Sequence, residues 1–267
     1  MTAHDLVGSQ AVPRGQRRDL RLFLLRGFRL THRSVPLKLP LSAQRLLALL
    51  ALSDRSVSRA QVAATLWRDY PEERAGANLR SALWRLRRPG LAVVEADGDR
   101  LGLSFDVSVD LHEAISRAWR ILSGDDLDDL DDRWFVADLL PGWYEEWLSL
   151  ERERFHQLRL HALETLAERL IEAGRYARAI DTAMAAVHAD PLRETARVAL
   201  IRVHLAEGNL SQAVHAYRRY HALLGQELGL EPLTQLGELL AERQDSAGRS
   251  VRHHRAPVAS KTGRMLA

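Results

Sequence analysis

Hydrophobic and polar residues alternate over three short runs near the start of the chain. Residues 20–25 (Leu-Arg-Leu-Phe-Leu-Leu), 28–33 and 35–39 each have the length and composition of a β-strand. Gly27 separates the first two runs. Pro36 favours an edge position for the third, because proline lacks the N–H that a central strand donates. The pattern therefore predicts a small antiparallel meander.

A helical period replaces this alternation beyond the third run, and three helices follow in close succession. Ser42 is the expected N-cap of the first helix, whose leucines occupy most sides and are therefore expected to be buried. Ser58 is the expected N-cap of the second helix. Residues 69–88 form the third helix after a connection of a few residues, and two helices joined so tightly are typical of a helix-turn-helix.

The third predicted helix carries its own start and stop signals. Asp69 and Glu72 have the spacing of a capping box, and Pro71 suits a first helical turn. Pro89-Gly90 ends the helix. Its apolar residues fall on a single stripe that must face a core, and these are Ala75, Leu79, Ala82, Leu83 and Leu86.

The opposite arc of this helix carries cations and short hydrogen-bonding side chains. Its members are Arg74, Ala77, Asn78, Ser81, Trp84, Arg85 and Arg88, with Arg80 and Arg87 at its flank. Arginine pairs with guanine, asparagine with adenine, and a small apolar group meets the thymine methyl, so this face is typical of a major-groove reader. The helix alone leaves a second interpretation open, an amphipathic surface helix with a solvated basic face.

Residues 93–103 predict a β-hairpin, because Asp97-Gly98 is a pair that tolerates the positive φ angles of a tight turn. Residues 106–110 are then expected to lead into a helix at 111–122. The acidic run at 125–132 is expected to be an extended connector, and it lacks the glycine and terminal glutamate of a calcium loop.

The rest of the chain is helical and repetitive. Gly174 and Gly208 lie 34 residues apart, as do Ala179 and Ala213, and this period is that of tetratricopeptide repeats. The glycines are expected to open the turns between paired helices, and the alanines to allow close packing. The predicted helices cover residues 143–173, 176–189, 192–207, 210–228 and 233–244.

The net charge of the chain is only +3, but positive and negative residues are distributed unevenly along it. Residues 1–105 hold 18 Lys and Arg against 9 Asp and Glu, whereas residues 106–247 hold 15 against 26, and the last 20 residues hold 5 against 0. A basic front half joined to an acidic module suggests that the front half binds a polyanion.

Several other classes of protein lack support in the sequence. No apolar run approaches about 18 residues, and no signal peptide is indicated. The chain has no cysteine, which suits a reducing cytoplasm. There is no phosphate-binding loop, no Gly-x-Ser-x-Gly elbow and no metal-binding His-Glu-x-x-His, so we expect neither an enzyme nor a bound cofactor or metal.

The order of three strands, three helices and a hairpin resembles the OmpR/PhoB-type winged helix. Segments of this half are similar to SARP-type (antibiotic regulatory protein) activators, namely residues 44–50 (Gln-Arg-Leu-Leu-Ala-Leu-Leu), 57–59, 66–67 and 77–88. Segments of the second half resemble the bacterial transcriptional activator domain, namely residues 139–142, Trp147, 151–154, 189–194 and 227–232. Two features depart from the family pattern, the abrupt stop at Pro89-Gly90 and Ala43 in place of a basic residue.

The resemblance implies a mostly α protein with a small β part. It places a winged-helix DNA-binding domain at 19–106 and a tetratricopeptide-like activator domain at 107–245. Residues 1–18 and 246–267 lack an apolar pattern, so we expect a disordered arm and a disordered basic tail there. It further implies a cytoplasmic, nucleoid-associated transcriptional activator that binds promoter direct repeats as a dimer. Such an activator contacts RNA polymerase or its sigma factor and controls a secondary-metabolite gene cluster.

Within this interpretation, Asn78, Ser81, Arg85, Arg80 and Trp84 are the candidate base-reading residues. The candidate backbone contacts are Arg45, Arg74, Arg87, Arg88 and the wing residue Arg100. Trp84 has the alternative of packing against sugar or against the wing. A repeat-based interaction adaptor whose winged helix no longer binds DNA, and a repressor, remain the alternative functions.

Overall fold

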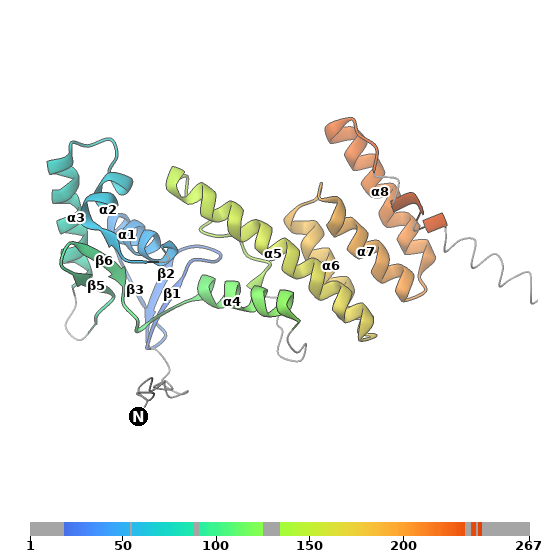
Figure 1. The fold of residues 1–267 in the computed structure, drawn as a ribbon, viewed down its shortest axis with the longest axis horizontal. Helices are drawn as coiled ribbons and strands as arrows, with labels where there is room; N and C mark the ends of the chain where they lie inside the picture. Colours follow the sequence, from blue (N-terminus) through green and yellow to red (C-terminus); the bar gives the residue numbers. More distant parts are fainter. Residues whose placement is uncertain are drawn as a thin grey trace, which may run out of the picture. The chain divides into compact units, whose positions relative to one another are not determined.

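The computed structural model describes residues 19–53, 55–87, 91–124, 134–232, 236–238 and 240–241 (Figure 1). Its contacts divide the chain into two compact units. The N-terminal unit comprises Met1–Ala114 with Ala137–Arg154, and the helical unit comprises Ile115–Val136 with Phe155–Ala267. The arm predicted at 1–18, the acidic run at 125–132 and the tail at 246–267 lie outside the described residues.

The first sheet of the N-terminal unit contains the expected meander. Strands β1 (Leu20–Phe23), β2 (Arg29–His32) and β3 (Val35–Leu37) pair antiparallel in that order. β3 forms an edge of the sheet, as Pro36 predicted. The leucines of β1 are buried while the residues between and after them are not, so one face of this strand contributes to the core.

A fourth strand joins this sheet in a segment where the sequence predicted only a lead into a helix. β7 (Val107–Val109) pairs in parallel with β1, and its two valines are buried. A run of three residues is too short to indicate a strand by its pattern. Its partner also lies far earlier in the sequence, so local signals could not reveal the pairing.

Asp110 follows β7 and fastens it to the end of β1. Its carboxylate accepts the backbone N–H of Leu24 at 2.8 Å, of Leu25 at 3.1 Å and of Leu111 at 2.8 Å. The residue is buried, and burial raises the pKa of its carboxyl group while the three backbone donors act in the opposite direction. The carboxylate thus satisfies two amides that the end of β1 leaves without strand partners.

A later segment, at Leu139 and Leu140, also contacts the residues that follow β1. Leu25 forms a bridge with Leu139, and the N–H of Leu140 donates to the carbonyl of Leu24 at 2.8 Å. The N-terminal compact unit therefore reaches beyond residue 106, where the sequence placed the end of the winged-helix domain.

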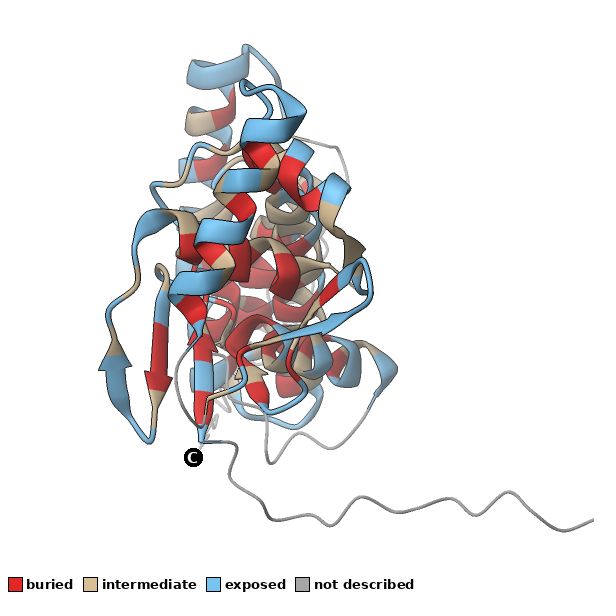
Figure 2. Cartoon of the chain, turned by 90° about the vertical axis from the view of Figure 1, so that its left-hand side faces the viewer, coloured by how far each residue is buried: buried red, intermediate tan, exposed pale blue. Residues whose placement is uncertain are grey.

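Three helices pack against one another in the N-terminal unit, α1 (Leu41–Leu52), α2 (Arg59–Leu66) and α3 (Glu72–Leu86). Ser58 is confirmed as the N-cap of α2, because its hydroxyl accepts the N–H of Gln61 at 3.2 Å. α1 is buried on several sides, through Ala43, Leu46, Leu47, Ala48, Leu50 and Ala51. Figure 2 shows the buried positions in red along the helices and strands, with exposed positions in pale blue between them.

The other two predicted caps are wrong. Pro40 occupies the N-cap position of α1 and Pro71 that of α3, and neither position has a side-chain capping hydrogen bond. Proline locks φ close to the values seen here, −67° and −55°, and leaves no N–H to satisfy. The chain therefore enters each helix at the proline, so Ser42 lies inside the first turn of α1 and Asp69 lies before α3.

The predicted hairpin is confirmed. β5 (Val94–Asp97) and β6 (Arg100–Leu103) pair antiparallel, and Gly98 in the turn has φ +54°. β6 also pairs with the short strand β4 (Val57–Ser58) before α2, which gives a second, three-stranded sheet.

The remaining helices are α4 (Asp110–Ser123), α5 (Glu146–Glu172), α6 (Tyr176–Ala189), α7 (Glu194–Ala206) and α8 (Leu210–Leu228). α6 and α8 have the predicted bounds, and the others differ from the prediction by one to three residues at their ends. Of the helix expected at 233–244, residues 236–238 and 240–241 are described and helical.

The helical unit confirms the structural reason for the 34-residue repeat. Gly174 has φ +69° and Gly208 has φ +86°, a conformation that residues with a Cβ adopt at a cost. The N–H of the residue after each glycine donates to the carbonyl five residues earlier, at 2.8 and 2.7 Å respectively. This is the Schellman arrangement that ends a helix, so the two glycines close equivalent helices of the two repeats.

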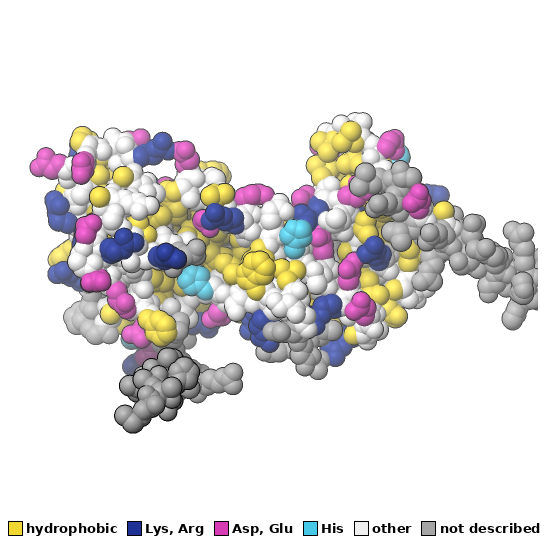
Figure 3. Space-filling model, viewed as in Figure 1, with side chains coloured by type: hydrophobic (Ala, Val, Ile, Leu, Met, Phe, Trp, Pro, Cys, Tyr) yellow, Lys and Arg dark blue, Asp and Glu magenta, His cyan; other side chains and the backbone are white. Residues whose placement is uncertain are grey.

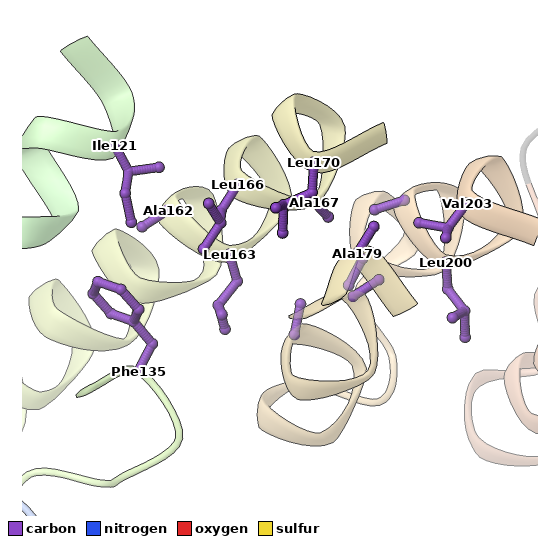
Figure 4. Close-up of a cluster of buried hydrophobic side chains, with 14 of the residues drawn as sticks. Ile121, Phe135, Ala162, Leu163, Leu166, Ala167, Leu170, Ala179, Leu200 and Val203 are labelled. Atoms are coloured by element: carbon purple, nitrogen blue, oxygen red, sulfur yellow. The ribbon is translucent and has the colours of Figure 1, made fainter. Parts of the chain in front are cut away.

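Small residues let the repeat helices pack closely. Figure 4 shows Ala162 and Leu163 of α5 in the buried cluster, together with Phe135 from the segment before that helix. α6 contributes Ala179, and α7 contributes Leu200 to the same cluster. The expectation that alanines permit close helix packing is confirmed.

We expect Asp110→Ala to lower the free energy of unfolding by about 1 to 3 kcal/mol, because the amides of Leu24 and Leu25 lose their acceptor while buried. Urea titration measures the loss, and amide hydrogen exchange should accelerate at these two leucines. Asp106→Ala removes an exposed carboxylate four residues earlier and should change stability by less than about 0.5 kcal/mol. Equal effects of the two variants would contradict the role of Asp110.

We expect Gly174→Ala and Gly208→Ala each to lower the free energy of unfolding by about 1 to 2 kcal/mol, because an alanine is strained at their φ angles. Space is not the cause, since a Cβ at either position meets nothing within 4 Å. Gly225 lies in the body of α8 with equally open space around it. Gly225→Ala should therefore raise the free energy of unfolding by roughly 0.5 to 1 kcal/mol, because alanine favours the helix more than glycine does. Thermal unfolding of the three variants checks the contrast in sign.

Candidate nucleic-acid interface

A stripe of buried residues packs α3 against the other helices of the N-terminal unit. Ala75, Leu79, Ala82 and Leu86 are buried, and α3 contacts both α1 and α2. Leu83, which was also assigned to the stripe, is half-buried. The stripe therefore determines which residues of α3 face outward.

The predicted outer face of α3 is exposed. The exposed residues are Arg74, Ala77, Arg80, Ser81, Trp84, Arg85 and Arg87. Asn78 is half-buried, and Arg88 lies outside the described residues. Trp84 keeps 72% of its surface exposed.

The cations of this face are available for an external ligand. Among the described residues, no hydrogen bond or ion pair engages the guanidinium groups of Arg80, Arg85 or Arg87. Arg74 lies over the ring of Tyr70, 5.0 Å from its centroid. In the view of Figure 3, basic and acidic side chains are mixed over the surface of the N-terminal unit. The three arginines differ from this pattern, because no carboxylate of the described residues pairs with them.

Two other candidate backbone contacts are already engaged within the N-terminal unit. Arg45 Nη2 pairs with Glu145 at 2.6 Å, with each side chain only 24% exposed. Arg100 donates from Nε to the Ser56 hydroxyl at 2.9 Å and from Nη2 to the Ser56 carbonyl. The structure thus groups the α3 residues on one surface and leaves Arg45 outside that group.

The hairpin presents mixed charge. Asp97, Asp99 and Arg100 are all exposed. Glu95 is exposed as well, and its carboxylate accepts the Ser104 hydroxyl at 2.8 Å and the N–H of Phe105 at 3.1 Å. Any approach of the hairpin to phosphate therefore depends on Arg100 extending beyond the neighbouring carboxylates.

The sequence did not reveal a groove between α2 and α3. Its volume is about 1110 Å³, and its lining includes Trp67, Tyr70 and Leu79 together with Arg59 and Arg80. Trp67, Arg68 and Tyr70 of the connection between the two helices are among its lining residues. Side chains from both helices form it, so the pattern of either helix alone gave no signal for it.

The described part of the chain offers no support for two other kinds of site. No helix there is both long enough and apolar enough to cross a membrane. No group of three or more His, Asp or Glu side chains there is placed to hold a metal ion.

A winged helix followed by a helical repeat unit is an architecture of bacterial transcription regulators. Residues 108–242 match the bacterial transcriptional activator domain, and this match covers slightly more than half of the chain. The chain therefore belongs to the bacterial transcriptional activator domain family, and with its N-terminal unit it is a SARP-type transcriptional regulator. The resemblance drawn from the sequence motifs is confirmed at this level.

Two curated relatives agree with this assignment. The chain is 30% identical over 206 residues to the regulatory protein AfsR of Streptomyces coelicolor and 28% identical over 210 residues to that of Streptomyces griseus. Each match covers 73% of this chain but 21% of the relative, so the chain spans about a fifth of the length of these relatives.

A solved structure supports the fold. Mycobacterium tuberculosis EmbR, determined in complex with a low-affinity phosphopeptide, matches with a TM-score of 0.68 at 21% identity. The match covers 90% of this chain and 73% of that chain. It confirms the predicted fold class, a winged helix joined to an all-α repeat domain.

We expect the Arg45 and Glu145 side chains to be coupled by about 1 kcal/mol or more in a double-mutant cycle of Arg45→Met and Glu145→Gln, because the pair is largely buried. Trp147 adds to the site by donating its indole N–H to Glu145 at 3.1 Å. The more exposed pair of Arg21 and Glu113, 3.8 Å apart, should show a coupling below about 0.5 kcal/mol. Urea unfolding of both cycles tests the contrast, and equal couplings would refute it.

Proposed function

We propose that the protein is a sequence-specific DNA-binding transcriptional activator that inserts α3 into the major groove of promoter DNA. The observation that carries this proposal is the outer face of α3, where three guanidinium groups have no partner among the described residues. Carboxylates on this helix are confined to Glu72 and Glu73 in its first turn. A solvated surface helix would gain from partners along its length, whereas a DNA-binding helix must keep its cations available.

Sequence recognition is assigned to the middle of α3. Asn78, Ser81 and Arg85 lie one helical turn apart in succession, so their side chains point in similar directions. Amide, hydroxyl and guanidinium groups are suited to base edges in the major groove. Arg80 and Trp84 lie beside them, and the exposed indole of Trp84 is placed to contact a base or a sugar.

Positioning along the duplex is assigned to arginines that neutralise phosphates. Arg74 and Arg87 lie at the two ends of α3, and Arg88 follows the helix. Arg100 would contribute from the hairpin. Arg45 could contact phosphate only by giving up its ion pair with Glu145, so it is the weakest member of this set.

Activation is proposed to act through a contact with RNA polymerase or its sigma factor. The connection between α2 and α3 supports this, because Tyr70, Glu72 and Glu73 are exposed there beside the α2–α3 groove. The acidic helical unit is a second candidate contact. By likeness to SARP-type regulators, we propose binding as a dimer to direct repeats and control of a secondary-metabolite gene cluster.

We expect Arg85→Ala to relax specificity at one base pair and to weaken binding to the cognate site by about 1 to 3 kcal/mol, with little effect on random duplex. Arg88→Ala should weaken binding to cognate and random duplexes alike, because it removes a phosphate contact. The slope of the logarithm of the binding constant against the logarithm of the salt concentration should fall in magnitude by about 1. Genome-wide mapping of bound sites followed by footprinting supplies the cognate site. Fluorescence anisotropy at several salt concentrations measures both duplexes.

Arg218→Ala is the matched control, since it removes an exposed arginine of α8 in the helical unit and should leave both affinities unchanged. Equal losses on cognate and random duplexes for Arg85→Ala would contradict its base-reading role. A purified protein that binds no duplex at any salt concentration would instead favour the adaptor function.

A further inference from the structure

The helical unit contains a second hollow that the proposed function does not use. It lies among α6, α7 and α8 and has a volume of about 430 Å³. Such a volume is within the range of small-molecule sites in proteins. Apolar side chains, among them Met184 and Leu200, form part of its lining.

Apart from Gln212, the polar side chains of the lining are arginines and histidines. Arg197 and Arg219 contribute guanidinium groups, and His188, His204 and His215 contribute imidazoles. No aspartate or glutamate is among its lining residues. This is notable because the surrounding region, residues 106–247, holds 26 Asp and Glu against 15 Lys and Arg.

The two arginines are not neutralised by the rest of the described chain. No ion pair there involves Arg197 or Arg219. Arg197 donates from Nε and Nη2 to the neutral carbonyl of Pro191, at 3.3 and 3.0 Å, and lies 5.5 Å from the centroid of the Tyr220 ring. Burial, and then the like charge of Arg219, lower the pKa of Arg197, while Tyr220 acts in the opposite direction. The two cations therefore repel one another without a counter-charge between them.

His204 also lines the hollow, and one of its ring nitrogens lacks a partner among the described residues. Its Nδ1 atom is buried and makes no hydrogen bond with the described residues. Burial lowers the pKa of this imidazole, with Glu207 acting in the opposite direction, so the ring is neutral at physiological pH. A neutral imidazole offers one donor and one acceptor, and a buried polar atom without a partner is costly.

We propose that this hollow is a binding site for a small amphipathic anion, a carboxylate or phosphate monoester carried on an apolar group. The arginine pair supplies charge and hydrogen bonds to the anion, and the apolar lining accepts the attached group. The basic last 20 residues of the chain have the wrong charge for this site. The proposal goes beyond DNA binding and is independent of it, because the ligand is bound by the helical unit alone.

The test is isothermal titration of the full chain, without DNA, with phenyl phosphate, phenylacetate, inorganic phosphate and the neutral phenylacetamide. We expect saturable binding of one aromatic anion per chain and at least about tenfold weaker binding of phenylacetamide, because the amide lacks the charge. Comparing phenyl phosphate with phenylacetate identifies which anion is preferred. Inorganic phosphate should bind more weakly than phenyl phosphate, because it cannot use the apolar lining.

Variants on neighbouring positions of α8 separate a built site from general electrostatics. Arg219→Gln should weaken binding at least about tenfold, whereas Arg218→Gln removes the same charge outside the hollow and should leave binding within about twofold. Arg197→Gln should also weaken binding, and circular dichroism checks that it folds, since Arg197 bonds to Pro191. Equal losses from Arg218→Gln and Arg219→Gln, equal binding of phenylacetamide, or no saturable binding of any anion would each overturn the proposal.

Discussion

The burial of a narrow stripe on α3 is the constraint on which the proposed DNA-binding face depends. Two of its four buried members, Ala75 and Ala82, are small, so the helix backbone can approach α1 and α2 closely. Each residue turns the helix by about 100°, so the buried stripe also fixes the direction of every other side chain. A rotation by one position would push Arg80 or Arg85 toward the core, at the cost of burying an unpaired charge.

Features that arise from neighbouring residues were predictable from the sequence, and those that depend on distant partners were not. The hairpin, the bounds of α6 and α8, and the exposed face of α3 follow from local periodicity and turn chemistry. The pairing of β7 with β1 and the bond between Arg45 and Glu145 join residues far apart in sequence. The exposure of Arg85 was therefore inferable, while the engagement of Arg45 was visible only in the fold.

The distribution of charge matters more than its sum in both units. Some arginines of the N-terminal unit, such as Arg45 and Arg100, are held by internal partners, whereas Arg80 and Arg85 of α3 have no hydrogen-bond or ion-pair partner among the described residues. The helical unit belongs to an acidic region, yet Arg197 and Arg219 gather in one hollow without a carboxylate in its lining. Net charge alone reveals neither group of arginines.

The parallel pairing of β7 with β1 has a consequence for how the protein is made. When only the chain up to the β5–β6 hairpin has left the ribosome, β7 and Asp110 have not yet emerged. The later segment that contacts Leu24 and Leu25 has not emerged either. Until then the outer side of β1 is an open strand edge, which is prone to pair with other chains. The nascent chain thus completes its first sheet only when Val107–Val109, which forms the last of the four strands, has left the ribosome.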